Sequence, residues 1–280
     1  MTHLGFDVVR LPGCAKQRTD VQSRKIVEGE SMTNDIPQHF DEAFLRWFRE
    51  QTEETWQRYQ TRTLEEIVVS RVGGHDWQQG TRWLGGLSDQ EIVTIEQHYQ
   101  VRFPPDYRLF LQVLHSVDRP LVGARYLDDK TMIPTTAPSF YNWQTDTEAI
   151  QATYEWLVEG LVFDVQHNDL WLQSWGAKPT TLEAQKALVR DLVNAAPKMI
   201  PVFGHRYLLA EPCEVGNPVF SIYQSDIIIY GEDLHSYFLH EFGDLAGEGK
   251  SVHDRRRQVR LELYQTIPFW GELLYGEFSS

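Results

Sequence analysis

The sequence predicts an α+β protein with a central, largely antiparallel β-sheet flanked by helices and preceded by an N-terminal helical extension. Three observations predict this class: helical spacing of apolar residues in the first half, short β-type runs clustered after residue 198, and a high aromatic content. Nine Trp, twelve Tyr and fourteen Phe within a chain that is 41% apolar favour a packed core over disorder. Because helices precede clustered strands instead of alternating with them, α+β is favoured over α/β.

The N-terminal quarter divides into a leader and a helical segment. Residues 1–36 show no periodicity, so we expect a disordered leader, with Met32 as a possible true start. Residues 37–75 form the predicted extension, one long helix or two, ending at Gly73-Gly74. One apolar stripe opens it, formed by Phe40, Phe44, Trp47 and Phe48. Such a stripe favours core packing, and a partner-binding face is the alternative.

A helical corner is the best-defined local feature. Ser88-Asp89-Gln90-Glu91 predicts a capping box that opens a helix. The Phe103-Pro104-Pro105 segment ends that helix, because the residue before a proline avoids the α region. A second helix is predicted from Pro105-Asp106. The apolar positions of both helices predict one buried cluster: Ile92, Ile95, Tyr107, Phe110, Leu111 and Leu114.

The remaining elements complete a domain over residues 76–243. A helix is predicted over 147–159, stopped by Gly160, with a strand at Leu161–Val165 and a capping box at Thr180–Glu183 before another helix. Three short strands follow, and a last helix ends at Gly243. These strands are Met199–Phe203, Val219–Tyr223 and Ile227–Tyr230. The tail over 244–280 is expected to pack on the domain.

The sequence motifs predict no catalytic residue, no metal site and no cofactor. No phosphate-binding glycine loop, nucleophile elbow or zinc-protease motif is present. His235 and His240, beside Glu241, lie five positions apart on one predicted helix, so their side chains point about 140° apart and cannot share an ion. Asp164 and His167 are close enough for an acid–base pair, although an exposed polar turn is favoured. Cys213 has no local activating base, which favours a structural thiol.

An aromatic, irregular region supplies the candidate protein-binding residues. Trp171 and Trp175 lie four apart, and Tyr141 and Trp143 precede them. Tryptophan in loops forms either a binding hot spot or a lid over the core, and the lid is the stronger alternative. The candidate protein-binding set comprises Tyr141, Trp143, Asp164, Trp171 and Trp175.

Charge and composition limit the partners. The net charge of −14 disfavours nucleic acid and is compatible with a basic protein, although an acidic surface can serve solubility alone. No apolar run reaches the 18 residues that a membrane span needs. Only Cys14 and Cys213 are present, too few for a disulfide scaffold, so the cytoplasm is expected.

One stretch resembles a known family. The segment "LSDQEIVTIEQHYQVRFPPDYRLFL", which follows Trp83-Leu84-Gly85-Gly86, is similar to the hallmark of the SUKH superfamily, the Smi/Knr cell-wall-assembly-regulator domain. Glu96 and the Pro-x-Asp-Tyr motif correspond, and later segments such as "MIPVFGHRYL" and "IPFWGELL" resemble a large-bodied branch of that family. The sequence departs from the pattern at His115–Pro120, where many relatives have an Asn-Gly turn.

The resemblance implies a non-enzymatic α+β module. In bacteria such domains are thought to be immunity proteins that neutralise toxins, often nucleases, by direct binding. A regulatory scaffold for an endogenous partner and an enzyme with an unrecognised site are the alternatives. A neighbouring toxin gene would separate the first two readings, and a buried carboxylate–His cluster in a deep pocket would favour the third. The resemblance assigns no catalytic residue.

Overall fold

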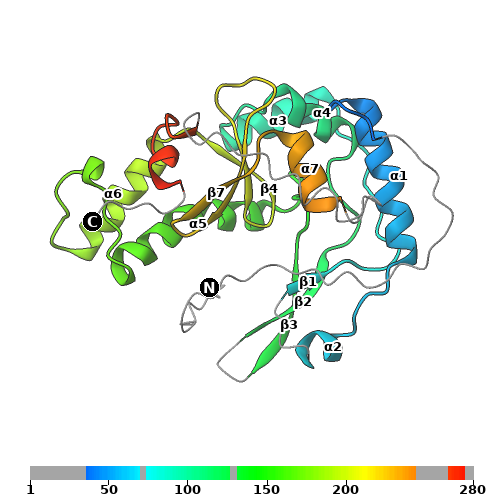
Figure 1. Cartoon of the computed structure of the whole chain (residues 1–280), viewed down its shortest axis with the longest axis horizontal. Helices are drawn as coiled ribbons and strands as arrows, with labels where there is room; N and C mark the ends of the chain where they lie inside the picture. Colours follow the sequence, from blue (N-terminus) through cyan, green and yellow to red (C-terminus); the bar gives the residue numbers. More distant parts are fainter. Residues whose placement is uncertain (1–35, 70–73, 127–130, 244–263, 275–280) are drawn as a thin grey trace.

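The computed structural model describes residues 36–69, 74–126, 131–243 and 264–274 (Figure 1). The predicted leader, Met32, and most of the tail therefore lie outside the described residues. The elements in chain order are α1 (Glu42–Arg58), α2 (Leu64–Val69), β1 (Gly74–Asp76), α3 (Asp89–Tyr99), α4 (Pro105–Val113), β2 (Leu121–Tyr126), β3 (Met132–Ala137), α5 (Thr147–His167), the 3-10 helix η1 (Gln173–Trp175), α6 (Leu182–Ala195), β4 (Met199–Phe203), β5 (Arg206–Leu209), β6 (Val219–Tyr223), β7 (Asp226–Gly231), α7 (Leu234–Phe242) and the 3-10 helix η3 (Trp270–Leu273). This mixture of helices and antiparallel strands confirms the α+β class.

The central sheet is antiparallel in the order β4-β5-β6-β7, and it separates two apolar cores. Alternate residues of a strand point to opposite faces, so Val219 joins one core while Phe220 and Ile222 join the other. Helices α1, α3, α4 and α7 contribute to the first core, and α5, α6 and η3 contribute to the second. Figure 1 shows α1, α3, α4 and α7 gathered toward one end of the molecule and α6 at the other. The three predicted strands are confirmed, with β5 added between β4 and β6.

A second, three-stranded antiparallel sheet was not predicted. Its order is β1-β2-β3, and the β2–β3 hairpin projects below the body of the protein in Figure 1, beside α2. The strands are short and rich in Gly, Pro and Thr, for example Gly123 opposite Thr135. A sequence of this kind lacks the regular apolar alternation that marks a strand.

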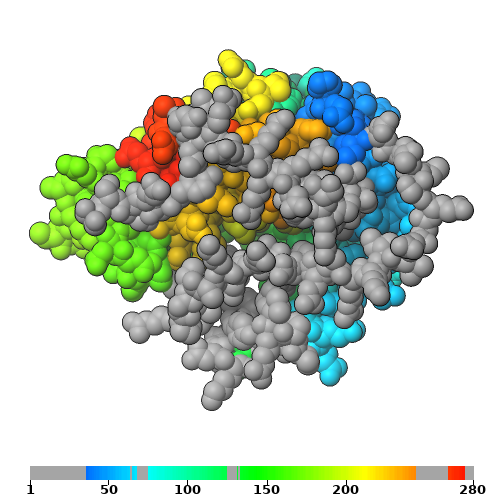
Figure 2. Space-filling view, in the orientation of Figure 1, coloured from blue at the N-terminus to red at the C-terminus, as the bar shows by residue number. Residues whose placement is uncertain are grey.

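The helical corner forms as predicted. The side chain of Ser88 accepts from the Glu91 backbone N–H and the Glu91 carboxylate accepts from that of Ser88, which is the capping box. Helix α4 begins at Pro105, and all six residues of the predicted cluster are buried. The corner also holds the β5–β6 loop, which is yellow at the top of Figures 1 and 2, because the Gly216 N–H donates to Asp106 Oδ2 over 3.0 Å.

Helix α1 packs into the first core, as its apolar stripe predicted. Phe44, Leu45 and Phe48 are at most 1% exposed. Arg49 donates to the carbonyl oxygens of Leu84 and Val113 over 3.2 and 2.5 Å, which fixes α1 against the corner. The predicted extension over residues 37–75 contains two helices, α1 and α2. Strand β1 begins at Gly74, where the extension was expected to end.

Helix α5 corrects two predictions. It runs through Gly160 to His167, so Gly160 does not stop it and Leu161–Val165 is helical, not a strand. A Cβ at Gly160 would lie 3.1 Å from the Cα of Gln224 in the β6–β7 turn, so this glycine permits a close approach. The start of α6 is also corrected by one position, since Thr181, not Thr180, is the N-cap and accepts from the Ala184 N–H.

Candidate protein-binding surface

The structure places Tyr141 and Trp143 in the first core, each at most 6% exposed. The Trp143 indole N–H donates to the Tyr107 hydroxyl over 2.9 Å, and the Tyr141 hydroxyl donates to the Gly204 carbonyl over 3.0 Å. Both polar tips are thus satisfied inside the protein. These two side chains join the helical corner to the central sheet and offer no exposed anchor.

Trp171 and Trp175 lie over the second core, as the lid alternative anticipated. Trp175 is buried and stacks on Phe269 with 6.0 Å between ring centroids. Trp171 is half-buried, and its indole N–H donates to the Gly176 carbonyl over 2.8 Å. The two tryptophans contact each other edge to face but belong to a different core from Trp143. The five predicted residues therefore do not form one exposed patch.

Asp164 has a positioning role that the sequence did not indicate. It is 3% exposed on α5 and accepts from the Ser225 backbone N–H over 2.8 Å and from the Ser225 hydroxyl over 2.5 Å. A third donor is Asn168 Nδ2 at 2.6 Å, whereas the ring of His167 packs on Phe163. Asp164 therefore fixes the turn of the β6–β7 hairpin to α5 and is not part of an acid–base pair with His167.

Two groups of ring contacts lie along the β6–β7 hairpin, one beside its turn and one near the far end of β7. Trp156 lies 5.8 Å from Tyr223, Tyr223 lies 6.2 Å from His205, and Tyr230 stacks on His240 at 4.5 Å with 7° between planes. Every one of these side chains is at least partly exposed, and Tyr223 is 52% exposed. We call this set the aromatic surface: Trp156, His205, Tyr223, Tyr230 and His240.

Arg206 is buried and contacts both groups of rings in the aromatic surface, through Tyr230 in one and His205 in the other. Its guanidinium carbon lies 3.7 Å from the centroid of the Tyr230 ring, and its Nε donates to Glu241 Oε2 over 3.1 Å. Burial opposes its charge, but Glu241 and Tyr230 outweigh that effect and raise the pKa of Arg206. Arg206 also donates to the Ser221 hydroxyl over 2.9 Å and to His205 Nε2.

The charge state of His205 follows from its burial and from its contact with Arg206. Burial, together with the positive charge of Arg206, lowers the pKa of His205 to about 3. The imidazole is therefore neutral at pH 7, and its Nε2 accepts from the guanidinium. Arg206, His205 and Glu241 form a hydrogen-bonded network that also contacts the Tyr230 ring.

Carboxylates border the aromatic surface. Asp226 is exposed and is the cross-strand partner of Tyr223 in the β6–β7 hairpin. Glu155 precedes Trp156 on α5 and accepts from Arg190 over 3.2 Å. Arg190 balances the charge of Glu155, whereas the exposed carboxylate of Asp226 favours a cationic over an anionic partner.

The histidines that resembled a metal site point to separate partners. His235 Nε2 lies 2.9 Å from the Pro37 carbonyl oxygen, His240 Nδ1 lies 3.1 Å from that of Tyr230, and Glu241 pairs with Arg206. Among the described residues, no group of three or more His, Cys, Asp or Glu is arranged to hold a metal ion. Over the same residues, no helix combines the length and the apolar character needed to span a bilayer.

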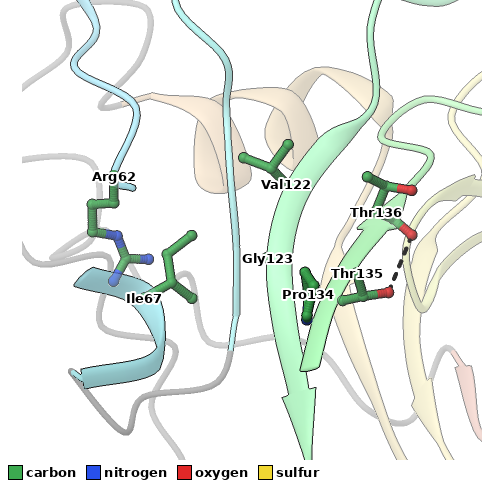
Figure 3. A pocket seen from close by; sticks show the side chains of 7 residues that line it. All are labelled: Arg62, Ile67, Val122, Gly123, Pro134, Thr135 and Thr136. Carbon is green, nitrogen blue, oxygen red and sulfur yellow. Dashed lines mark hydrogen bonds between the residues drawn. The ribbon is translucent and has the colours of Figure 1, made fainter. Parts of the chain in front are cut away.

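A groove of about 440 Å³ lies between α2 and the β2–β3 hairpin (Figure 3). Its lining residues are Arg62, Ile67, Val122, Gly123, Pro134, Thr135 and Thr136. The volume suits a small ligand, but such sites place a few convergent polar groups in the cavity. Here the Arg62 guanidinium is held by both carboxylate oxygens of Asp76, over 2.7 and 2.8 Å. The groove therefore offers mainly apolar contact.

The aromatic surface was missed because its residues carry no motif. The available signal was the hairpin around Gln224-Ser225, whose two-residue turn makes Tyr223 and Asp226 direct neighbours. No protein-family model, curated protein or solved structure matches the chain.

Proposed function

We propose that this chain is a non-enzymatic, SUKH-like protein-binding module of the cytoplasm that acts as an immunity-type protein. It neutralises a basic toxin domain by direct binding, and the aromatic surface is the contact. The observation that carries the proposal is a pair of partly exposed ring groups, Trp156 with Tyr223 and His205, and Tyr230 with His240, with Arg206 in contact with both.

The composition of this surface supports protein binding. Tyrosine, tryptophan and arginine are the residues most enriched at interaction hot spots, since they bury large areas with few rotatable bonds. The rings are also held in advance, because Asp164 fixes the turn beside Tyr223 and Arg206 fixes Tyr230. Ordering these side chains before binding reduces the entropy that association costs.

Charge supports a basic partner. The net charge is −14, and Asp226 and Glu241 adjoin the rings. A toxin that acts on nucleic acid needs a positive surface to bind phosphates, and that surface is complementary to an acidic inhibitor. A chain that covers this positive surface would block the toxin by binding alone, with no catalytic step.

The test starts with quantitative capture from the native host by the tagged full chain and by its Tyr223→Ala variant. The captured protein is then expressed alone, to measure growth arrest, and together with the chain, to measure rescue. With purified proteins, stopped-flow association should slow as salt rises from 50 to 500 mM, since the Debye length shortens from roughly 14 to 4 Å. Tyr223→Ala should accelerate dissociation.

Each result discriminates. A basic partner that arrests growth and is rescued by the chain supports the proposal. A non-toxic endogenous partner would instead favour the regulatory scaffold. Salt-independent association with unchanged dissociation of the Tyr223→Ala variant would remove the aromatic surface from the contact.

A further inference from the structure

One half of the aromatic surface already binds a guanidinium. Arg206 lies against the Tyr230 ring, 3.7 Å from guanidinium carbon to ring centroid, while its Nε reaches the Glu241 carboxylate over 3.1 Å. The aromatic face supplies cation–π attraction, and the carboxylate supplies a charge-assisted hydrogen bond. This pair of contacts defines the chemistry that stabilises an arginine beside β7.

The hairpin tip presents the same two groups to solvent. Tyr223 is 52% exposed, Asp226 is exposed, and the two are directly opposite in the β6–β7 register. Cross-strand partners have Cβ atoms about 5 Å apart on one face of the sheet, so the ring and the carboxylate are neighbours. A guanidinium placed on the ring would therefore have a carboxylate within reach.

The tip is also held rigidly. Ser225 is bound to Asp164 through its backbone N–H and its hydroxyl, and the absence of a side chain at Gly160 lets the turn approach α5. The Tyr223 ring is supported by His205 at 6.2 Å and by Trp156 at 5.8 Å. Asp226 and Tyr223 therefore keep their relative positions before a partner arrives, as a specific subsite requires.

We infer that Tyr223 and Asp226 form an arginine subsite, in which a guanidinium of the partner stacks on the Tyr223 ring and donates to the Asp226 carboxylate. The inference rests on the proposed function and adds the chemical group that is recognised. Arginine is favoured over lysine, because its planar guanidinium stacks and donates at once, whereas an ammonium is a hydrated point charge. Nucleic acid is disfavoured, because a phosphate on the Tyr223 ring would meet the exposed carboxylate of Asp226.

The experiment uses the full chain and a short probe, acetyl-Gly-Arg-Gly-Arg-Gly-amide, titrated by two-dimensional NMR of the ¹⁵N-labelled protein. Two matched probes replace both arginines by citrulline, which is isosteric and neutral, or by lysine. The arginine probe should bind about tenfold more tightly than the citrulline probe, and shifts should centre on Tyr223 and Asp226. The lysine probe should bind more weakly than the arginine probe.

Variants separate the two contacts. Tyr223→Ala and Asp226→Asn should each weaken the arginine probe about fivefold or more, whereas Tyr223→Phe should retain binding, since it keeps the ring. Asp191→Asn, an exposed carboxylate on α6, is the charge-matched control and should have no effect. Since the altered side chains are exposed, the variants should keep the fold, which the NMR spectra verify directly.

Equal binding of arginine and citrulline probes, or full binding by Asp226→Asn, would overturn the subsite. Tighter binding of an oligothymidine of ten nucleotides than of the arginine probe would also overturn it. If the probes fail while a basic toxin is still captured and neutralised, only the subsite is wrong. If the arginine probe discriminates while no basic partner is neutralised, the subsite stands and the proposed function fails.

Discussion

Replacing Asp164 by alanine should destabilise the protein and loosen the surface that we propose as the contact. Asp164 is 3% exposed and accepts three hydrogen bonds, two from Ser225 and one from Asn168, at 2.5 to 2.8 Å. Hydrogen bonds to a charged group each contribute about 1.5–3 kcal/mol when buried. Asn168 is exposed and Ser225 is half-buried, so both regain water in the variant. Because these donors regain water, we expect each lost bond to cost only about 1 kcal/mol, so the Asp164→Ala variant should lose about 3 kcal/mol of unfolding free energy in total.

Urea unfolding followed by circular dichroism measures this loss. Asp191→Ala, which removes an exposed carboxylate, should stay within about 0.5 kcal/mol of the unaltered protein. Ser225→Ala keeps the backbone N–H bond and should cost about 1 kcal/mol. Because Asp164 and Ser225 share a bond, the double variant should cost less than the sum of the singles. An Asp164→Ala protein as stable as the Asp191→Ala control, or strict additivity, would refute this account of the turn.

Three further outcomes are expected from urea unfolding of single variants. Leu111→Ala should lose about 2–5 kcal/mol, whereas Leu182→Ala, at a position 41% exposed, should lose much less; equal losses would contradict burial of the corner. Trp175→Ala should lose about 3–5 kcal/mol, and an unchanged midpoint would show that Trp175 is not a core lid. Burial lowers the pKa of His115 from 6.5 to about 4, so below pH 6.5 only the unfolded chain gains this proton and stability falls as pH drops toward 4. His115→Asn, which suits the positive φ of 63°, should reduce that slope by up to about 1.4 kcal/mol per pH unit, and an unaltered slope would refute the assignment.

Features set by neighbours in the sequence could be predicted. The capping box at Ser88, the start of α4 at Pro105 and the buried faces of both helices follow from contacts within a few residues. Gly160 shows the limit of such reasoning. A glycine after an apolar helical stretch usually ends the helix, but here the helix continues, because the glycine gives room to Gln224, 64 positions away. Rules based on neighbouring residues cannot predict a contact between residues so far apart in the sequence.

Most of the predicted protein-binding residues are buried for a related reason. Tryptophan is a strong indicator of binding hot spots, yet Trp143 and Trp175 fill the two cores that flank the sheet. Whether a large ring is exposed depends on which helix covers its face, and that is decided by the packing of the whole chain. Tyr223 follows the buried Ile222 in β6, and its ring, which points to the other face of the strand, is 52% exposed.

The residues behind the family resemblance have structural tasks in this protein. Glu96 accepts from the Phe103 N–H over 2.8 Å and from Arg108 over 2.7 Å, which fixes the corner between α3 and α4. Asp106, whose pKa is raised by burial, accepts from the Tyr107 and Gly216 N–H groups and so fastens the β5–β6 loop to α4. These carboxylates are therefore occupied within the fold, and the β6–β7 hairpin, which Asp164 attaches to α5, is the element that we propose contacts the partner.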